Sequence, residues 1–295
     1  DVILSGDENL IKSYLGNEKI PVINYPQVIS MDDDPAKAIR SNKDSSIIGA
    51  LNLVKEKKAD AVFSAGSTGA TLIGAISVLG KIKGVTRPTI ASVLPGKEKE
   101  VILVDSGANL EVKPKVLYQF AIMGSKLSEL LFDIENPRIG LINNGEESSK
   151  GRELEKATFK LLKSSQLNFI GNVEGKDFAN SKVDVFVTDG FTGNVVLKTL
   201  QGVAKLQQDL ISKSLKENLF KPLLIPVKNA ISPVKSMLNP NSTNGSYLLG
   251  VNGLVIIGHG SSNSEAIKNA LLFTSRAVEK RFINKFTEVS SELWM

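Results

Sequence analysis

Short apolar runs, rich in β-branched residues, alternate along the chain with longer segments in which apolar residues recur every three or four positions. The short runs predict strands, and the longer segments predict helices. Such alternation is typical of an α/β fold in which parallel strands are joined by crossover helices. Runs that are apolar at every position, such as residues 101–104, predict strands buried on both faces of the sheet.

The boundaries of the expected elements follow from these runs and from the turn residues between them. The expected strands are Val2–Leu4, Pro21–Asn24, Ala61–Ser64, Thr89–Leu94, Val101–Asp105, Arg138–Asn143, Asn168–Val173, Val183–Thr188 and Leu254–Gly258. The expected helices are Glu8–Leu15, Pro35–Ile39, Ser46–Lys57, Thr68–Leu79, Lys115–Phe132, Gly151–Lys163, Asn194–Leu215 and Ser262–Phe286.

One stretch, residues 218–245, breaks the alternation because prolines punctuate it and exclude a long regular helix. It is rich in apolar residues, and Lys221, Lys228 and Lys235 recur at a spacing of seven. We expect one α/β domain over residues 1–295, with this stretch as an insertion. A large apolar surface with basic residues favours contact with a membrane surface, a partner or a second subunit. A flap that packs on its own domain is the alternative.

Charge and composition narrow the function classes. Lysine and arginine number 36 and aspartate and glutamate 31, so the formal net charge is +5. This mild excess favours anionic ligands or an anionic surface over nucleic acid, whose binders usually cluster positive charge. The absence of cysteine excludes a disulfide scaffold, a thiolate metal site and a cysteine nucleophile. The single histidine, His259, excludes a multi-histidine site, so we expect no metal.

Two features bear on location. Residues 61–80 carry no charge, but glycines and hydroxyl residues interrupt them. We therefore expect a buried strand, a turn and a helix there, not a membrane span. No secretory signal opens the chain, which favours a cytoplasmic protein.

Ligands of an open parallel sheet bind beyond the carboxyl ends of its strands, so the residues after each strand are the candidates. Gly66, Ser67, Thr68 and Gly69 follow the third expected strand and open a helix. Backbone N–H groups and the helix dipole at such a turn bind phosphate well. The alternative is a tight turn with a helix cap. The turn matches neither a Walker loop nor a dinucleotide fingerprint, so we expect no such cofactor.

Two further strand ends carry an acid followed by small polar residues. Asp105 begins the sequence Asp-Ser-Gly-Ala-Asn that ends at Asn109, and it either orients a nucleophile or fixes the turn. Asp189 precedes Gly193 and Asn194, where a long helix begins whose first turns contain Lys198. A glycine-flanked helix start with an acid before it is a second candidate binding turn.

The last expected strand leads into His259, Gly260, Ser261 and Ser262. Ser262 and Glu265 have the spacing of a capping box, which predicts a helix start at this point. A lone histidine is usually structural, but its position at a strand end beside glycine and serine favours a functional role.

The strand end after residue 142 leads into a charged loop that contains Glu147 and Lys150. It is either a solvated loop or a cationic site for an acidic ligand. No serine-hydrolase elbow is present. Taken together, the residues indicate a phosphate or phosphorylated ligand, and they do not name the reaction.

The same residues resemble the bacterial phosphate acyltransferase (PlsX) family of phospholipid synthesis. The resemblance runs in order over nearly the whole chain. The motifs that carry it are Lys43-Asp44-Ser45-Ser46, Ser64-Ala65-Gly66-Ser67-Thr68-Gly69-Ala70, Arg87-Pro88, Asp105-Ser106-Gly107-Ala108-Asn109, Gly145-Glu146-Glu147 with Lys150-Gly151, Gly171-Asn172-Val173-Glu174-Gly175, Thr188-Asp189-Gly190-Phe191-Thr192-Gly193-Asn194 and His259-Gly260-Ser261-Ser262. The family usually has an earlier strand with an Asp- and Gly-rich turn, and nothing at the start of this sequence corresponds to it.

The resemblance implies transfer of a fatty acyl group from acyl carrier protein to inorganic phosphate, without a cofactor. It also implies a three-layer αβα fold with a mostly parallel sheet, similar to isopropylmalate dehydrogenase and phosphotransacetylase. A homodimer with peripheral membrane association is implied as well. Two other functions stay open, which are a phosphotransacetylase-like transferase that uses acyl-coenzyme A and a non-catalytic phosphoester-binding scaffold.

Roles for individual residues follow from the resemblance and the strand-end positions. We expect His259 to protonate or hydrogen-bond the leaving thiolate, Asn109, Asn194 or Lys198 to stabilise the oxyanion, and Asp105 or Asp189 to orient donors. The expected phosphate-binding residues are Gly66, Ser67, Thr68, Gly69, Gly107, Gly193, Ser261 and Ser262. The expected substrate-binding residues are Lys43, Glu147 and Lys150.

Overall fold

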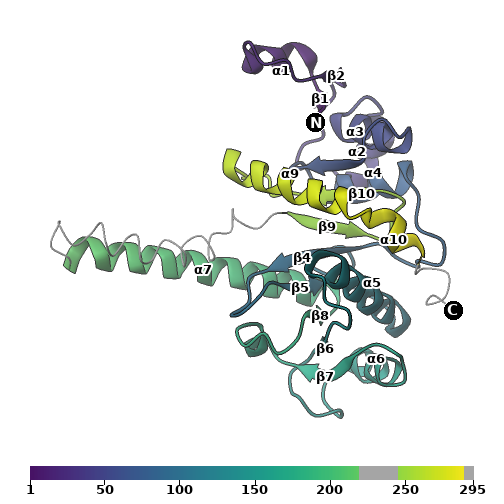
Figure 1. The fold of residues 1–295 in the computed structure, drawn as a ribbon, viewed down its shortest axis with the longest axis vertical. Coiled ribbons are helices and arrows are strands. Elements are labelled where there is room, and N and C mark those ends of the chain that lie inside the picture. The colour runs from purple at the N-terminus through teal and green to yellow at the C-terminus, as the bar shows by residue number, and fades with distance from the viewer. Residues whose placement is uncertain (219–244, 289–295) are drawn as a thin grey trace.

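A computed structural model describes residues 1–218 and 245–288, and its centre is an eight-stranded sheet (Figure 1). A separate pair of parallel strands, β1 (Leu4–Gly6) and β2 (Val22–Asn24), lies near the N-terminus. The order of strands across the main sheet is β3 (Ala61–Ser64), β10 (Leu254–Ile257), β9 (Ser246–Leu249), β4 (Thr89–Leu94), β5 (Val101–Val104), β8 (Val185–Val187), β6 (Ile139–Ile142) and β7 (Phe169–Val173).

The sheet is mostly parallel, but its two halves run in opposite directions. β3 pairs with β10 in parallel, and β5, β8, β6 and β7 form a second parallel group. Between the groups, β9 is antiparallel to both β10 and β4, and β4 is antiparallel to β5. The carboxyl ends of β3, β10 and β4 therefore lie at one edge of the sheet, and those of β5 to β8 lie at the opposite edge.

Two connections between neighbouring strands contain no crossover helix, and none was expected between Leu94 and Val101. Residues 95–100 join β4 to β5, and residues 250–253 join β9 to β10, without a helix in either case. Connections this short join antiparallel neighbours, because a parallel return needs a crossover of a dozen or more residues.

Helices cover both faces of the sheet, which gives the three-layer αβα architecture. On one face, α5 (Pro114–Phe132), α6 (Glu153–Lys163), α9 (Ser264–Glu279) and α10 (Phe282–Glu288) share a core with the sheet. On the other face, α2 (Pro35–Ser41), α3 (Ser46–Lys55) and α4 (Thr68–Val78) cover the half that contains β3 and β10. The 3-10 helix η1 (Gly175–Phe178) and α7 (Gly190–Asn218) cover the other half of that face. The remaining helix, α1 (Glu8–Leu15), packs on the small sheet.

Three elements differ from their predicted form. β9 was not predicted, because its short apolar run directly follows the proline-rich stretch. The expected helix Ser262–Phe286 is two helices, since Arg281 adopts a left-handed conformation (φ 53°) that ends regular helix geometry. α7 begins earlier and ends later than expected, and Figure 1 shows it projecting from the body.

The proline-rich insertion expected at residues 218–245 lies outside the described residues, apart from its end residues. Within the described ranges, no helix has the length and apolar character needed to cross a bilayer. Residues 61–80 form β3, a turn and α4, as predicted.

Candidate active site

A cavity of about 470 Å³ is lined by residues of β3, β4, β9, β10, α4, α7 and α9 and of the loop after β5. Apolar side chains and small polar groups share its wall. The lining residues are Phe63, Thr68, Gly69, Leu72, Ile90, Ser92, Val93, Leu94, Ser106, Gly107, Ala108, Asn194, Leu197, Lys198, Gln201, Gly245, Ser246, Ile257, Gly258, His259, Ser262, Ala266 and Ala270. Several expected site residues therefore meet at one place, although they come from distant parts of the chain.

The N-terminus of α4 forms one wall of the cavity. The hydroxyl of Ser67 caps this helix by accepting a hydrogen bond from the N–H of Ala70 at 3.4 Å. Thr68 and Gly69 precede Ala70 in the first turn and line the cavity. First-turn N–H groups have no partner within their helix, so they are donors suited to an anion. Gly66 and Ser67 do not line the cavity. Ser67 contributes to this wall by capping α4.

The turn after β10 lies beside the turn that opens α4, since the N–H of Gly258 donates to the carbonyl of Ser64 at 2.8 Å, and it contributes His259 to the lining. Nδ1 of His259 accepts a hydrogen bond from the N–H of Ser261 at 3.2 Å and lies 2.7 Å from the Ser261 hydroxyl oxygen. A ring nitrogen that accepts from a backbone N–H carries no hydrogen. The neutral ring therefore bears its hydrogen on Nε2, which makes Nε2 the donor available to a ligand.

The helix after His259 begins one position later than the predicted capping box requires. Asn263 is the N-cap of α9, and its side chain accepts a hydrogen bond from the N–H of Ala266 at 2.9 Å. The predicted pairing of Ser262 with Glu265 is thus wrong. Ser262 instead belongs to the turn, where its N–H donates to the carbonyl of His259 at 2.9 Å, and it lines the cavity.

The loop after β5 is held by the buried carboxylate of Asp105. This carboxylate accepts hydrogen bonds from the N–H groups of Gly107, Ala108 and Asn109 at 2.8–2.9 Å. Burial raises the pKa of the Asp105 carboxyl, and these hydrogen bonds oppose that rise. Ser106, Gly107 and Ala108 line the cavity, and Asp105 does not.

Asn109 is committed to the same loop. Its side-chain Nδ2 donates to the carbonyl of Pro88 at 2.9 Å and to Asp105 at 2.8 Å, which uses both of its amide hydrogens. The residue is buried and does not line the cavity. Between the alternatives left open by the sequence, the contacts of Asp105 and Asn109 are those of residues that fix the turn.

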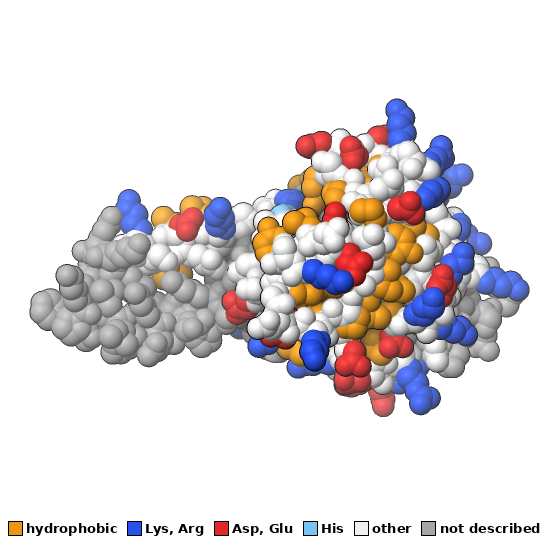
Figure 2. Space-filling model, turned by 90° about the horizontal axis from the view of Figure 1, so that it is seen from above, with side chains coloured by type: hydrophobic (Ala, Val, Ile, Leu, Met, Phe, Trp, Pro, Cys, Tyr) orange, Lys and Arg blue, Asp and Glu red, His pale blue; other side chains and the backbone are white. Residues whose placement is uncertain are grey.

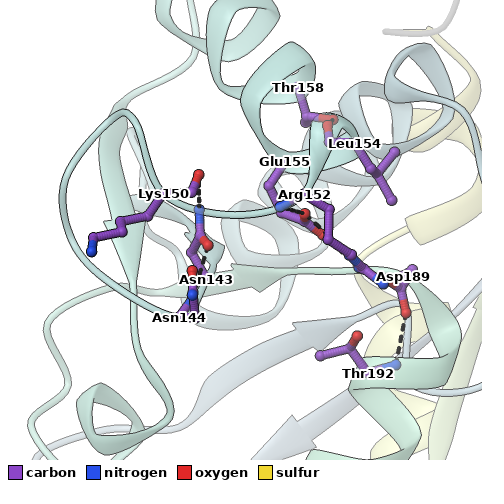
Figure 3. A network of polar contacts seen from close by, with 9 residues as sticks. All are labelled: Asn143, Asn144, Lys150, Arg152, Leu154, Glu155, Thr158, Asp189 and Thr192. Atoms are coloured by element: carbon purple, nitrogen blue, oxygen red, sulfur yellow. Dashed lines mark hydrogen bonds and ion pairs between the residues drawn. The ribbon is translucent and has the colours of Figure 1, made fainter.

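Asp189 has a similar structural position at the start of α7. One carboxylate oxygen accepts from the N–H of Thr192 at 2.7 Å, and the other pairs with Arg152 (Figure 3). Arg152 also pairs with Glu155, and both acids raise the pKa of the Arg152 guanidinium, Glu155 by the larger amount. This ion-pair network joins α6 to the beginning of α7 and leaves Asp189 buried outside the cavity lining.

The first turns of α7 bring two of the expected residues to the cavity. Asn194, Leu197, Lys198 and Gln201 line it, and their spacing of three and four positions places them on one side of the helix. The Lys198 ammonium donates to the Gln201 side chain at 3.4 Å. Gly193 is buried beneath this face against the loop after β5.

Lys43, Glu147 and Lys150 are exposed and do not line the cavity. The Lys43 ammonium donates to the carbonyl of Ile39 at 3.3 Å, and the N–H of Lys150 donates to the carbonyl of Glu147 at 3.0 Å. Glu147 and Lys150 follow β6, whose carboxyl end is at the edge opposite to that of β3 and β10. Ser261 also stays outside the lining and acts through the His259 ring.

Two serines in the wall were not identified from the sequence. Ser92 of β4 lies 2.8 Å from the hydroxyl oxygens of both Ser106 and Ser246 of β9. The signal was weak, since Ser92 is one hydroxyl residue in the otherwise apolar run Ala91 to Leu94. A buried serine within an apolar central strand needs a hydrogen-bond partner. Such a serine therefore indicates that other polar groups lie nearby.

Comparison with known proteins shows the family of this chain. Residues 1–285 match the family described as "Fatty acid synthesis protein". The chain is 44% identical over 299 residues to the phosphate acyltransferase of Desulfitobacterium hafniense, covering 99% of this chain and 89% of that protein. It is 42% identical over 291 residues to the phosphate acyltransferase of Halothermothrix orenii, covering 96% of this chain and 87% of that protein.

Solved structures of similar fold have much lower sequence identity. The EutD phosphotransacetylase from Staphylococcus aureus is 17% identical with a TM-score of 0.57, covering 92% of this chain and 82% of that one. A phosphotransacetylase from Streptococcus pyogenes is also 17% identical, with a TM-score of 0.56 and coverage of 92% and 83%. These likenesses support the α/β fold.

Proposed function

Because this chain belongs to the family of fatty acid synthesis proteins that contains the phosphate acyltransferases, we propose that it transfers a fatty acyl group from acyl carrier protein to inorganic phosphate. Membership makes it an acyltransferase enzyme of fatty acid and phospholipid synthesis. The products of the proposed step are an acyl phosphate and free carrier protein. The cavity that joins the α4 N-terminus, His259 and Lys198 is the observation that carries the proposal.

Phosphate would bind at the wall formed by Thr68 and Gly69, and Ser262 and Gly107 belong to the lining of the same cavity. Backbone N–H donors and the α4 dipole hold the anion there, and the Lys198 ammonium adds a positive charge. Phosphate is already a nucleophile, so the main task of the protein is to place it against the thioester and to stabilise developing charge.

The apolar part of the same wall suits the acyl chain. Phe63, Leu72, Val93 and Leu197 line the cavity beside the polar groups. A pocket that is largely apolar, with few polar groups that set orientation, is the usual form of a small-molecule site. The acyl chain would lie along these side chains, with its thioester carbonyl toward the phosphate.

In the proposed step, a phosphate oxygen attacks the thioester carbonyl carbon, a C–O bond forms, and the C–S bond then breaks. Asn194 and Lys198 are the lining residues on α7 that would donate to the oxyanion formed in between. The hydrogen that hydrogen phosphate carries ends on the departing thiol, so the step balances without an outside acid. Nε2 of His259 is the group that would donate to the sulfur.

A direct assay tests the proposal and separates the two transferase alternatives. Purified full chain is given phosphate with either an acyl carrier protein thioester or the matching coenzyme A thioester, and acyl phosphate is measured. We expect kcat/KM to be much higher for the carrier protein thioester. A preference for the coenzyme A thioester would favour the phosphotransacetylase-like activity, and absence of acyl phosphate with both thioesters would contradict both.

Homodimer formation and peripheral membrane association are further parts of the proposal. The projecting part of α7 supports a contact surface, since Val203, Leu206 and Leu210 are about half exposed on the side of the helix away from the cavity-lining residues. Figure 2 shows hydrophobic and charged side chains together on this part of the molecule.

Two measurements separate these parts. Sedimentation velocity reports the dimer, and co-sedimentation with anionic vesicles reports membrane binding. Leu210→Glu should weaken at least one of the two, while Tyr14→Glu, a change at another exposed apolar residue on α1, should weaken neither. A Leu210→Glu variant that behaves as wild type in both measurements would remove α7 as the contact surface.

A further inference from the structure

We propose that Ser246, Ser92 and Ser106 form a hydroxyl chain that makes the cavity prefer an anion carrying a hydrogen, such as inorganic phosphate, over an anion carrying none, such as sulfate. The inference rests on the proposed function in one respect, which is that phosphate is the anion bound in this cavity.

The three hydroxyls form a continuous series along the cavity wall, from two buried members to a half-buried one. Ser106 Oγ donates to the carbonyl of Ile90 at 3.1 Å, Ser92 Oγ donates to Ser106 Oγ at 2.8 Å, and Ser246 Oγ lies 2.8 Å from Ser92 Oγ. Ser92 and Ser106 are 4% and 6% exposed, whereas Ser246 is only half-buried. Ser246 is therefore the member of the series most open to a ligand.

Counting hydrogens fixes the direction of the series. A carbonyl oxygen only accepts, so the single hydrogen of Ser106 is used on Ile90, and the single hydrogen of Ser92 is used on Ser106. Ser246 must then be the donor in its contact with Ser92. Its hydroxyl has no hydrogen left for a ligand and offers only lone pairs to the cavity.

Reversing the series is possible but costs one hydrogen bond. If Ser106 donated to Ser92 and Ser92 to Ser246, the hydrogen of Ser246 would be free for a ligand. The bond from Ser106 Oγ to the carbonyl of Ile90 would then be lost, although that carbonyl keeps the N–H of Ser106 at 2.8 Å. The direction in which Ser246 donates to Ser92 and Ser92 donates to Ser106 is therefore favoured by about the free energy of one neutral hydrogen bond.

The strand register places the acceptor in the same row as the strand ends that lead to the expected anion position, and both line the cavity. Ser92 pairs with Ser246, Ser246 pairs with Ile257, and Ile257 pairs with Ser64, in one row across four strands. Ile257 leads directly into Gly258 and His259, and Ser64 leads into the turn that opens α4. Adjacent strands lie about 4.8 Å apart, so the Ser246 hydroxyl is within a few strand widths of both anion-binding walls.

The chemistry of the two anions then decides the preference. Inorganic phosphate at neutral pH retains at least one P–O–H group, which can donate to the lone pairs of Ser246. Sulfate at the same pH has only acceptor oxygens. It therefore cannot form a hydrogen bond with the lone pairs of Ser246 unless the series reverses. Charge alone does not produce this preference for phosphate over sulfate, because the preference depends on a hydrogen atom at one position of the anion.

Calorimetric titration of the full chain with sodium phosphate and with sodium sulfate at pH 7 tests the proposal without catalysis. Ser106→Ala removes the acceptor of the Ser92 hydrogen, so Ser92 donates to Ser246 and the Ser246 hydrogen becomes free for a ligand. We expect the ratio of phosphate to sulfate affinity to fall by roughly three- to tenfold, the effect of one neutral hydrogen bond. Ser246→Ala removes the acceptor from the half-buried end of the series and should lower the ratio similarly.

Ser128→Ala is the matched control, because Ser128 is a fully buried serine of α5 whose hydroxyl has no hydrogen-bond partner among the described residues. The ratio of phosphate to sulfate affinity of Ser128→Ala should equal that of the wild type. A wild-type ratio retained in both Ser106→Ala and Ser246→Ala would overturn the hydroxyl chain, as would a wild type that does not prefer phosphate. If the ratio shifts as expected but the transfer assay gives no acyl phosphate, the proposed function fails and the hydroxyl chain stands.

Discussion

Gly193 and Asp105 approach so closely that a β-carbon on Gly193 would stand 1.8 Å from the carbonyl oxygen of Asp105. Gly190 has the same kind of contact with the backbone of Asn109, at 2.7 Å. The first turn of α7 therefore rests directly on the loop after β5, backbone against backbone. Two loops from distant parts of the sequence form one unit, and that unit presents Asn194 and Lys198 to the cavity.

Replacing Gly193 by alanine should disturb this unit. No backbone shift smaller than about an ångström relieves a contact of this kind, so we expect a loss of about 1–3 kcal/mol in the free energy of unfolding, as for other overpacked sites. Activity should fall further than stability explains, because Asn194 and Lys198 move with the turn. Urea unfolding and acyl phosphate formation measure the two effects.

Gly202→Ala is the control for that change. Gly202 lies in the same helix, and a β-carbon there would have no neighbour within 4 Å. Alanine should stabilise the helix by about 0.5–1 kcal/mol through its better helix propensity, with activity unchanged. Equal behaviour of the two variants would contradict the close contact of Gly193.

His259→Ala should lower kcat roughly ten- to a thousandfold, the range for loss of one acid–base or oxyanion donor. The expected cause is loss of the Nε2 donor at the leaving sulfur. Ser261→Ala, which leaves the ring but removes a hydroxyl 2.7 Å from Nδ1, should have a smaller effect. Circular dichroism checks folding, and wild-type kcat in a folded His259→Ala variant would show that the residue is structural.

Gly69→Val should raise the KM for phosphate more than the KM for the thioester. A β-carbon at Gly69 would meet Cγ of Pro35 at 2.7 Å, so the first turn of α4 would have to move with its N–H donors. Steady-state kinetics with each substrate varied in turn separates the two constants. A rise in the thioester KM with an unchanged phosphate KM would show that this turn binds the thioester and not phosphate.

Asp184 gives a prediction about pH and stability away from the cavity. Burial acts to raise the pKa of this carboxyl, but the hydrogen bonds from Arg138 and Lys99 outweigh it, and the pKa lies below its ordinary value of about 3.9. The stability that the carboxylate contributes is therefore fully present above pH 4 and is lost as the pH falls through the lowered folded value.

Asp184→Asn should thus be less stable than the wild type by about 2 kcal/mol at pH 7, and the difference should shrink as the pH is lowered toward 3. Asp133→Asn, which alters an exposed pair with Lys280, should change stability by less than about 0.5 kcal/mol. Urea unfolding at several pH values provides the measurement. A difference that does not vary with pH would contradict the lowered pKa.

Apolar periodicity predicted most helices and strands because each element buries one stripe or one run against its neighbours. The Ser67 cap and the start of α4 follow from local chemistry alone, and the structure has both. Strand direction does not follow from local chemistry. The hairpin connections around β4 and β9 reverse half of the sheet, and no residue in those loops indicates which strands they will join.

That reversal explains part of the arrangement of the candidate residues. The turns after β3 and β10 share an edge, so Thr68, Gly69, His259 and Ser262 lie around one cavity. The chain leaves β5, β6 and β8 at the other edge, and the loop after β5 and the first turns of α7 bring Gly107, Asn194 and Lys198 to the cavity, whereas Glu147 and Lys150 after β6 do not line it. Ser92 and Ser246 could not be predicted as site residues, because a single serine in a strand belongs to no sequence motif. Their contact with each other follows only from the pairing of β4 with β9.

In the proposed reaction, phosphate itself attacks the acyl thioester in this cavity. The most direct measurement is a reaction of the full chain with an acyl carrier protein thioester and phosphate fully labelled with oxygen-18, followed by mass spectrometry of the product and titration of the released thiol. We expect an acyl phosphate that retains the whole label, with one thiol released for each acyl phosphate formed. Thiol release that proceeds without phosphate, giving free fatty acid in place of acyl phosphate, would contradict it.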